Sequence, residues 1–310
     1  MRILVVGDLH GNKPKIHFKE FDAIIAPGDF CGDKELGKIW KKIFKYHKEN
    51  PNSKIGPEEL YLNLSGGRRK LNAMEKRSLE DGRKILEYLN SFGKPVFITP
   101  GNWDQSYGKT LIKDMDKNDY NYMKSFLDFW LGEKTKPKLI KGLRNIRDCQ
   151  YNLYKFHGFN IIGYGLSSAP ENVNQRSHKK SKFTKKQSMI LKKMYGKIIE
   201  KLNNTYKKRD NKFPTIFITH NVPYNTKLDV VKNKDSSAHK KHVGSSIARD
   251  FIEKHKPIIC IGSHVHEGFG KDKIGRTICI NAGFGSNVNT LINLDEKKGK
   301  IKNIKFKRGK

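Results

Sequence analysis

Two histidines alternate in the stretch GSHVHE, residues 262–267, which directly follows the apolar run PIICI. Imidazole is poor material for a hydrophobic core, so two imidazoles at the end of a buried strand need an explanation. One explanation is a metal ion, because neutral imidazole is the commonest protein ligand for metals. The other is that a polar loop opens at Ser263 and that His266 lies on the surface. This stretch alone does not decide between them.

The same arrangement recurs along the chain, where five apolar runs each end in Asp, Asn or His. The residues concerned are Asp8 and His10, Asp29, Asn102, His220, and His264 with His266. Ligands of open α/β sheets bind outside the carboxyl ends of the strands, so we expect these side chains to converge. Some of them could be turn or cap residues. Five coincidences at equivalent positions are much less probable than one site.

The chemistry of these side chains indicates which ligand they hold. Carboxylates, imidazoles and one amide, without thiolates, suit divalent Mn, Fe, Zn, Co or Ni. Seven ligands are too many for one tetrahedral ion, whereas two ions that share a bridging carboxylate would use them well. Metal ions paired about 3.5–4 Å apart hydrolyse phosphate esters by activating water and neutralising the phosphoryl oxygens. The sequence therefore predicts a dinuclear phosphoester hydrolase that attacks with a metal-bridging hydroxide.

The elements that must position these residues alternate between strands and helices. Short runs rich in Val and Ile predict buried strands at 3–6, 23–26, 95–99, 215–219, 257–261 and 277–281. Apolar residues at helical spacing predict helices at 78–92 and 244–256, the second capped by Ser245 or Ser246. A hairpin is expected at 152–165 and two further strands in the tail from 290. The alternation favours an α/β layered fold, which we expect to form one domain over residues 1–310.

Two Lys-rich segments, 34–75 and 171–212, have the character of insertions. The first contains a weak helical pattern around IWKKIFKYH. The second contains a helix within 176–209 whose apolar stripe is formed by Met189, Ile190, Met194, Ile198 and Leu202. We expect this stripe to pack on the domain and the surrounding lysines to be mainly solvated.

The composition is that of a strongly basic globular chain. It has 310 residues, with 63 Lys and Arg against 31 Asp and Glu, and a formal net charge of +32. Such a surface attracts nucleic acid or phosphorylated small molecules, although a compositional bias that also enriches Asn and Ile would produce it too. No apolar stretch approaches the about 20 residues of a membrane span, so no membrane partner is expected. The four scattered cysteines favour a reduced, cytoplasmic protein.

The ordered series Asp8-x-His10, Gly28-Asp29, Gly101-Asn102, His220 and His264-x-His266 resembles that of the calcineurin-like metallophosphoesterases. The C-terminal third, with KHVGSSIARDF and HVHEGFGKDKIGRTICINAG, is similar to their prokaryotic, Icc-like cytoplasmic branch. This resemblance implies a four-layer αββα sandwich with a dinuclear centre. It assigns one ion to Asp8, His10 and His266, and a second to Asn102, His220 and His264. It makes Asp29 the bridge between them, so that Asp29 and Asn102 are expected to take part in catalysis.

Three positions depart from the family pattern. Trp103 stands where many relatives have a histidine that contacts phosphate and protonates the leaving group, and an indole cannot transfer that proton. Gly32 replaces an aspartate, with Asp33 one place late, and Ser263 replaces a glycine. We expect Asn102, Trp103 and His242 to contact the substrate. Asp33 and Asp104 are expected to support the ligands from behind.

These residues favour a phosphodiesterase, with two alternatives. A nuclease is favoured by the charge, if the helix within 176–209 supplies a basic groove. A non-enzymatic scaffold is the other, because such proteins share this fold; they usually lose metal ligands, which this chain retains.

Overall fold

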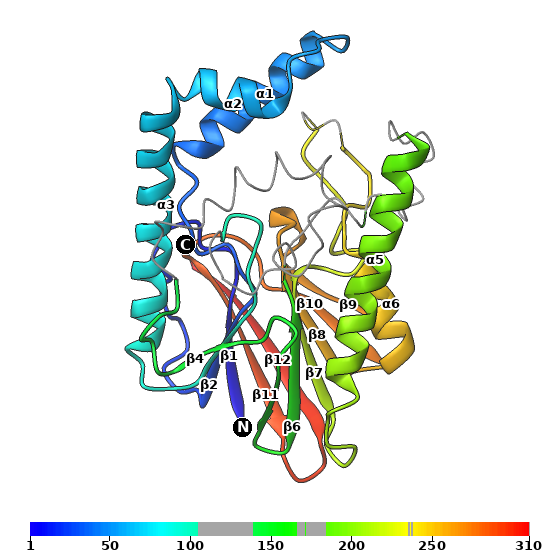
Figure 1. Cartoon of the computed structure of the whole chain (residues 1–310). Coiled ribbons are helices and arrows are strands. Elements are labelled where there is room, and N and C mark those ends of the chain that lie inside the picture. The colour runs from blue at the N-terminus through cyan, green and yellow to red at the C-terminus, as the bar shows by residue number, and fades with distance from the viewer. Residues whose placement is uncertain (105–138, 166–170, 172–183, 235, 237, 310) are drawn as a thin grey trace.

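The computed structural model describes residues 1–104, 139–165, 171, 184–234, 236 and 238–309, which form two six-stranded sheets (Figure 1). The first sheet has the order β12 (Lys300–Arg308), β11 (Val288–Asp295), β1 (Arg2–Val6), β2 (Ala23–Ala26), β3 (Val96–Ile98), β4 (Ile146–Asp148). The second has the order β5 (Leu153–Phe156), β6 (Phe159–Tyr164), β7 (Thr215–Asn221), β8 (Ile259–Ser263), β10 (Thr277–Asn281), β9 (Gly270–Ile274).

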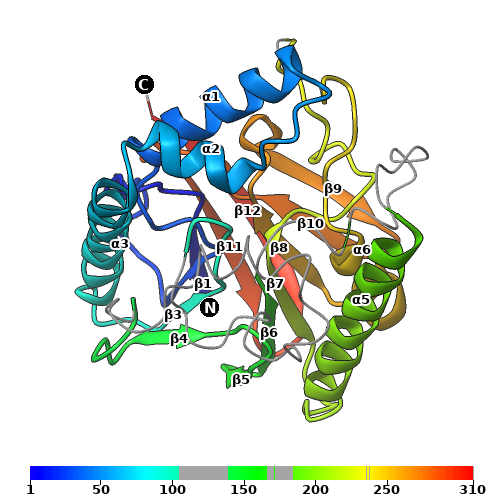
Figure 2. The same cartoon turned by 45° about the horizontal axis from the view of Figure 1, so that its top comes forward.

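Helices cover the outer face of each sheet, with the two sheets between them (Figure 2). On one side lies α3 (Arg68–Asn90), whereas α1 (Leu36–Glu49) and α2 (Pro57–Leu64) lie at the top of Figure 1, beyond the ends of the strands. On the other side lie α5 (Lys185–Tyr206) and α6 (Ser246–His255). The predicted four-layer αββα architecture is confirmed. No helix among the described residues has the length and apolar character that crossing a membrane requires.

The alternation of side chains along each strand produces these layers. In β1, Leu4 and Val6 pack in the cluster that contains α3 residues, whereas Ile3 lies in the cluster between the sheets. In β7, Phe217 packs toward α5 and α6, whereas Ile218 lies between the sheets. Because strands buried on both faces need apolar residues at every position, they read as continuous Val and Ile runs.

The predicted elements are present, with differences in extent. The strands expected from apolar runs, the hairpin and the two tail strands are confirmed, and the hydroxyl of Ser245 caps α6 by accepting from the Ala248 amide. The helix predicted to begin at 78 begins at Arg68, so the expected insertion boundary at 75 falls inside α3. β4 and β9 were not predicted: β4 is only three residues long, and β9, with the sequence GKDKI, is a polar edge strand.

One residue of the apolar stripe predicted for α5 is wrong. Met189 is 64% exposed, whereas Leu191 is fully buried and packs with Met194, Ile198 and Leu202. Leu191 precedes Met194 by three residues and Ile198 by seven, which places it on their face of the helix, whereas Met189 precedes Ile198 by nine and lies on the opposite face. Within the segment 171–212, residues 172–183 lie outside the described part of the chain.

Candidate metal centre

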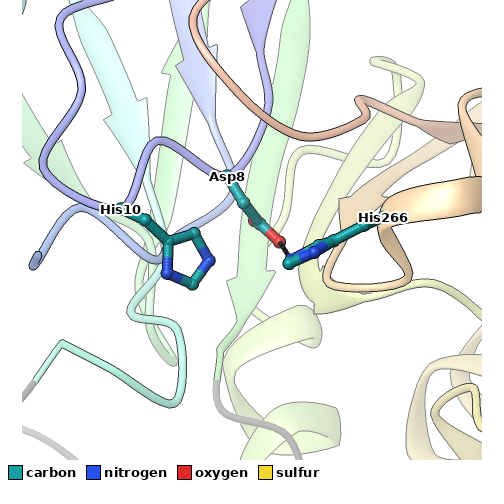
Figure 3. Close-up of side chains that lie close together, drawn as sticks. All are labelled: Asp8, His10 and His266. Atoms are coloured by element: carbon teal, nitrogen blue, oxygen red, sulfur yellow. Dashed lines mark ion pairs between the residues drawn. The ribbon is translucent and has the colours of Figure 1, made fainter. Parts of the chain in front are cut away.

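The seven residues expected to bind metal come together at the carboxyl ends of the strands. Six of them form two groups of three, in each of which the ligand atoms lie within 4.8 Å of one another. One group is Asp8, His10 and His266, with Asp8 lying between the two imidazoles (Figure 3). The other is Asp29, His220 and His264, and Oδ1 of Asn102 lies 2.9 Å from Nε2 of His220. Parallel pairing of β1 with β2, of β2 with β3, and of β7 with β8 creates this convergence.

Asp29 lies between the two groups. Its Oδ2 is 3.4 Å from Nε2 of His10 and 3.4 Å from Nε2 of His220. Its Oδ1 accepts a hydrogen bond of 2.8 Å from the backbone amide of Trp103. One carboxylate oxygen therefore faces both groups at once, as a bridging ligand must.

The hydrogen bonds of His220 indicate that its Nε2 offers a lone pair. Nδ1 lies 3.0 Å from the carbonyl oxygen of Pro27, which can only accept, so Nδ1 carries the proton. Nε2 then faces Oδ1 of Asn102 at 2.9 Å and Nδ1 of His264 at 3.1 Å. Such a gathering of electron-rich atoms is unfavourable without a cation between them. Nε2 of His10 is likewise buried and makes no hydrogen bond among the described residues. The donor set therefore fits divalent metal ions.

The electrostatics of the site also favour a cation. Burial opposes charge on His10, but the carboxylates of Asp33, Asp29 and Asp8 outweigh it and raise the pKa to about 9. Burial likewise opposes charge on His220, where Asp29, Asp8 and the Pro27 carbonyl raise the pKa to about 9. Burial likewise opposes the charge of Asp29, but His220 and His10 hold its pKa well below the usual range. A cluster that retains protons this strongly has excess negative potential, which bound divalent ions would neutralise.

The loops that carry the ligands adopt unusual backbone conformations. His10, Asp29 and His264 have φ values of 45°, 54° and 67°, a left-handed region that non-glycine residues rarely adopt. Such conformations cost free energy and cluster at functional sites. Gly101 is required because a Cβ there would lie 2.1 Å from Oδ1 of Asp29. The glycine before Asn102 thus lets the β3 loop approach the β2 loop.

The supporting residues resolve two of the departures from the family pattern. Asp33, although one place late, lies with Oδ2 3.2 Å from Nδ1 of His10, where a carboxylate can orient the imidazole. The hydroxyl of Ser263 donates to Oδ1 of Asp8, a contact that a glycine could not make. Asp104 is buried and accepts from the amides of Phe30, Cys31 and Gly101, which ties the β2 and β3 loops together.

The residues expected to contact substrate lie in different settings. Trp103 is half-buried, packs against the cores beside α3 and α1, and meets the His10 ring edge-on with centroids 6.2 Å apart. Nδ1 of His242 lies 2.7 Å from Oδ1 of Asp229, a fully buried carboxylate, and the His242 side chain is 33% exposed. The structure thus shows an ordered Asp–His pair, of which the sequence indicated only the histidine.

Phe284 is an aromatic residue of the site that the sequence analysis missed. It is 41% exposed and stacks on His266, with ring centroids 3.9 Å apart and an interplanar angle of 19°. Its signal in the sequence is weak: a single aromatic residue between two glycines, after the strand at 277–281.

Comparisons with known proteins agree with this architecture. The chain is 32% identical over 130 residues to the uncharacterized protein MJ1162 of Methanocaldococcus jannaschii, an alignment that covers 41% of this chain and 49% of that protein. A crystal structure superposes with a TM-score of 0.56 at 17% identity, covering 99% of this chain and 98% of that one. A putative 5'-nucleotidase from Staphylococcus aureus gives a TM-score of 0.45 at 14% identity, over 99% of this chain and 54% of that one. The family model of the calcineurin-like phosphoesterases matches residues 1–268, and the chain is therefore a member of that family.

Proposed function

We propose that this protein is a metal-dependent hydrolase of phosphoric esters that acts on phosphodiesters. The observation that carries the proposal is the position of Asp29, whose single Oδ2 lies 3.4 Å from an imidazole of each ligand group. Asp8, His10 and His266 would hold one divalent ion, and Asn102, His220 and His264 the other, as the family's use of two divalent metals requires. When bound, the two ions supply a hydroxide nucleophile at neutral pH and neutralise the phosphoryl oxygens.

The protein's own residues have separable tasks in this reaction. Asp33 and the Pro27 carbonyl orient His10 and His220 so that one nitrogen of each faces the ions. Asn102 directs its amide oxygen to the same space, 2.9 Å from Nε2 of His220, and its NH₂ group would be a donor for a phosphoryl oxygen. Trp103 cannot protonate a leaving group, so a leaving group that needs a proton must receive it from another residue.

His242 is the candidate proton donor in place of the missing histidine. Asp229 accepts from its Nδ1, which leaves Nε2 to exchange a proton with the leaving-group oxygen. The segment that carries Asp229 packs beside the loop of His264 and His266: Lys232 Nζ donates to the Glu267 carbonyl at 3.2 Å, and the Asn233 amide donates to Oε1 of Glu267 at 3.3 Å.

A nuclease is the second candidate, and the lysines of α5 favour it. Lys185, Lys186 and Lys192 are exposed on the half of α5 that lies toward the ligand-bearing strand ends (Figure 1).

Within the family we assign the chain to the Icc-like cytoplasmic branch, with manganese among the activating metals.

The test is to load the full chain with Mn, Fe, Zn, Co or Ni in turn. Bound metal is counted by mass spectrometry, and hydrolysis is followed with bis(p-nitrophenyl) phosphate. We expect two ions per chain and turnover with at least one metal. Two bound ions without turnover of any diester, monoester or oligonucleotide would support a scaffold instead.

A further inference from the structure

A basic cavity lies at the opposite end of the strands from the metal centre. It has a volume of about 630 Å³, within the range of small-molecule sites, and is lined by the first residue of β7, Thr215, and by Ile258 just before β8. Because β7 rises about 3.3 Å per residue, Thr215 lies about 17 Å from His220. The cavity is therefore separate from the metal centre.

Five cations surround the cavity: Arg209, Lys256, Arg276, Lys298 and Lys300. Four of them lie in connections, after α5, after α6, between β9 and β10, and between β11 and β12, and Lys300 begins β12. No carboxylate occurs among the described residues that line it, and none of the five forms an ion pair with a described residue. The neighbouring carboxylates face other groups. Asp210 lies 3.8 Å from Lys155, and Glu296 pairs with the N-terminal ammonium and with Nδ1 of His157. Asp295 lies 3.8 Å from Lys302 and accepts a hydrogen bond from the backbone amide of Lys298.

The cavity is ordered and partly apolar. The guanidinium of Arg209 is held 4.1 Å above the ring of Tyr206 and donates to the Tyr206 carbonyl at 3.3 Å. Phe213, which is 37% exposed, offers an open ring at the rim. Burial together with the charges of Lys254 and Arg209 lowers the pKa of the adjacent His255 to about 4, which agrees with a positive field here.

We propose that this cavity is a second binding site, for a phosphorylated small molecule that carries an aromatic group, of the size of a nucleotide. Planar guanidinium groups bind phosphate oxygens in pairs, and the ammonium groups add charge around them. The exposed ring of Phe213 gives an aromatic base a surface on which to stack. Convergence of unpaired cations around a concave, partly apolar surface is what distinguishes this cavity from the general lysine-rich exterior.

The test uses the full, metal-loaded chain and titration calorimetry with β,γ-methylene ATP at fixed ionic strength. Arg276→Gln with Lys300→Gln should weaken binding about tenfold or more, since hydrogen bonds to charged groups are lost. The matched control, Arg144→Gln with Lys94→Gln, removes the same charge from exposed positions at the other sheet and should lose less than about twofold. Hydrolysis of bis(p-nitrophenyl) phosphate should be unchanged in both. Equal losses, or no binding to the wild type, would overturn the proposal.

A second comparison tests the aromatic part of the ligand. Phe213→Ala should weaken binding of the nucleotide analogue several-fold and leave binding of inorganic tripolyphosphate unchanged. The same loss for both probes would show that the cavity holds phosphate alone, contrary to the class proposed.

Discussion

At the scale of single residues, the contacts behind the ligands decide how firmly the metals are held. Asp33→Asn should lower metal affinity about 10–100-fold, because Nδ1 of His10 loses the carboxylate 3.2 Å away that orients the ring. The measurement is a manganese titration of the metal-free protein. Asp272→Asn, at a half-buried carboxylate on β9, is the control and should bind as the wild type does. Unchanged affinity in Asp33→Asn would show that His10 is fixed by other means.

His242 makes the next prediction at this scale. A positioned general acid contributes about 10²–10⁴-fold, and only when the leaving group needs a proton. His242→Gln should therefore lower kcat by that range on an alkyl diester and by much less on a p-nitrophenyl ester. Equal losses on both esters would mean that His242 positions the substrate without donating a proton.

At the scale of secondary-structure elements, the strands differ in how clearly the sequence predicts them. Apolar runs located β1, β2, β3, β7, β8 and β10 because strands buried on both faces leave no polar position to obscure the pattern. β9 was not predicted, because only alternate residues of this strand are partly buried and the residues between them are exposed lysines. The ligands were visible because they follow the strands directly. Ser263 and Phe284 had no signal of that kind, since their partners Asp8 and His266 are brought to them only by tertiary packing.

Glu171, which contacts the start of α6, should make the stability of the folded protein depend on pH. Its carboxylate is buried and accepts from the hydroxyls of Tyr164 and Ser245, both at 3.0 Å, and burial raises its pKa to about 7 from 4.5. The folded state then binds more protons than the unfolded state between these values, so stability from this group is present at low pH and lost as pH rises from about 4.5 to 7. The loss is on the order of 3 kcal/mol.

Glu171→Gln should remove this dependence. Urea unfolding of the wild type and the variant at pH 5 and pH 8 gives the comparison, with the metal removed so that the centre contributes equally to both. The unfolding free energy should fall more from pH 5 to pH 8 in the wild type than in the variant. Parallel pH profiles would show that Glu171 is ionised in the folded protein.

At the scale of the whole molecule, the metal centre joins the two sheets. Asp8, His10, Asp29 and Asn102 follow strands of the first sheet, whereas His220, His264 and His266 belong to the second or follow it. Ions that bind only the folded protein stabilise it by about 2.7 kcal/mol per site at 100 times the Kd. Chelation should therefore lower the melting temperature, and His266→Ala should reduce that effect. A melting temperature that does not respond to metal would contradict a centre shared between the sheets.

The lysines of α5 should affect how fast the protein meets an anionic substrate. Changing Lys185, Lys186 and Lys192 to Gln should leave the melting temperature nearly unchanged, because exposed charges contribute about 0–1 kcal/mol each. The same changes should lower kcat/KM on single-stranded oligonucleotides more than on a small diester, and the difference should vanish in high salt. Equal, salt-independent rates on both substrates would remove nucleic acid from the candidate partners.

The backbone of Asp8 is hydrogen-bonded to residues that the ribosome adds much later. Its amide donates to the Gly283 carbonyl at 3.0 Å, and its carbonyl accepts from Gly285 at 2.8 Å. β1 pairs with β11, which is synthesised long after it. A ribosome that adds about 5–20 residues per second needs on the order of tens of seconds to pass from one to the other. For that time Asp8 lacks both of these backbone partners, so the part of the metal centre that Asp8 contributes can be fixed only after residues 283–295 have been synthesised.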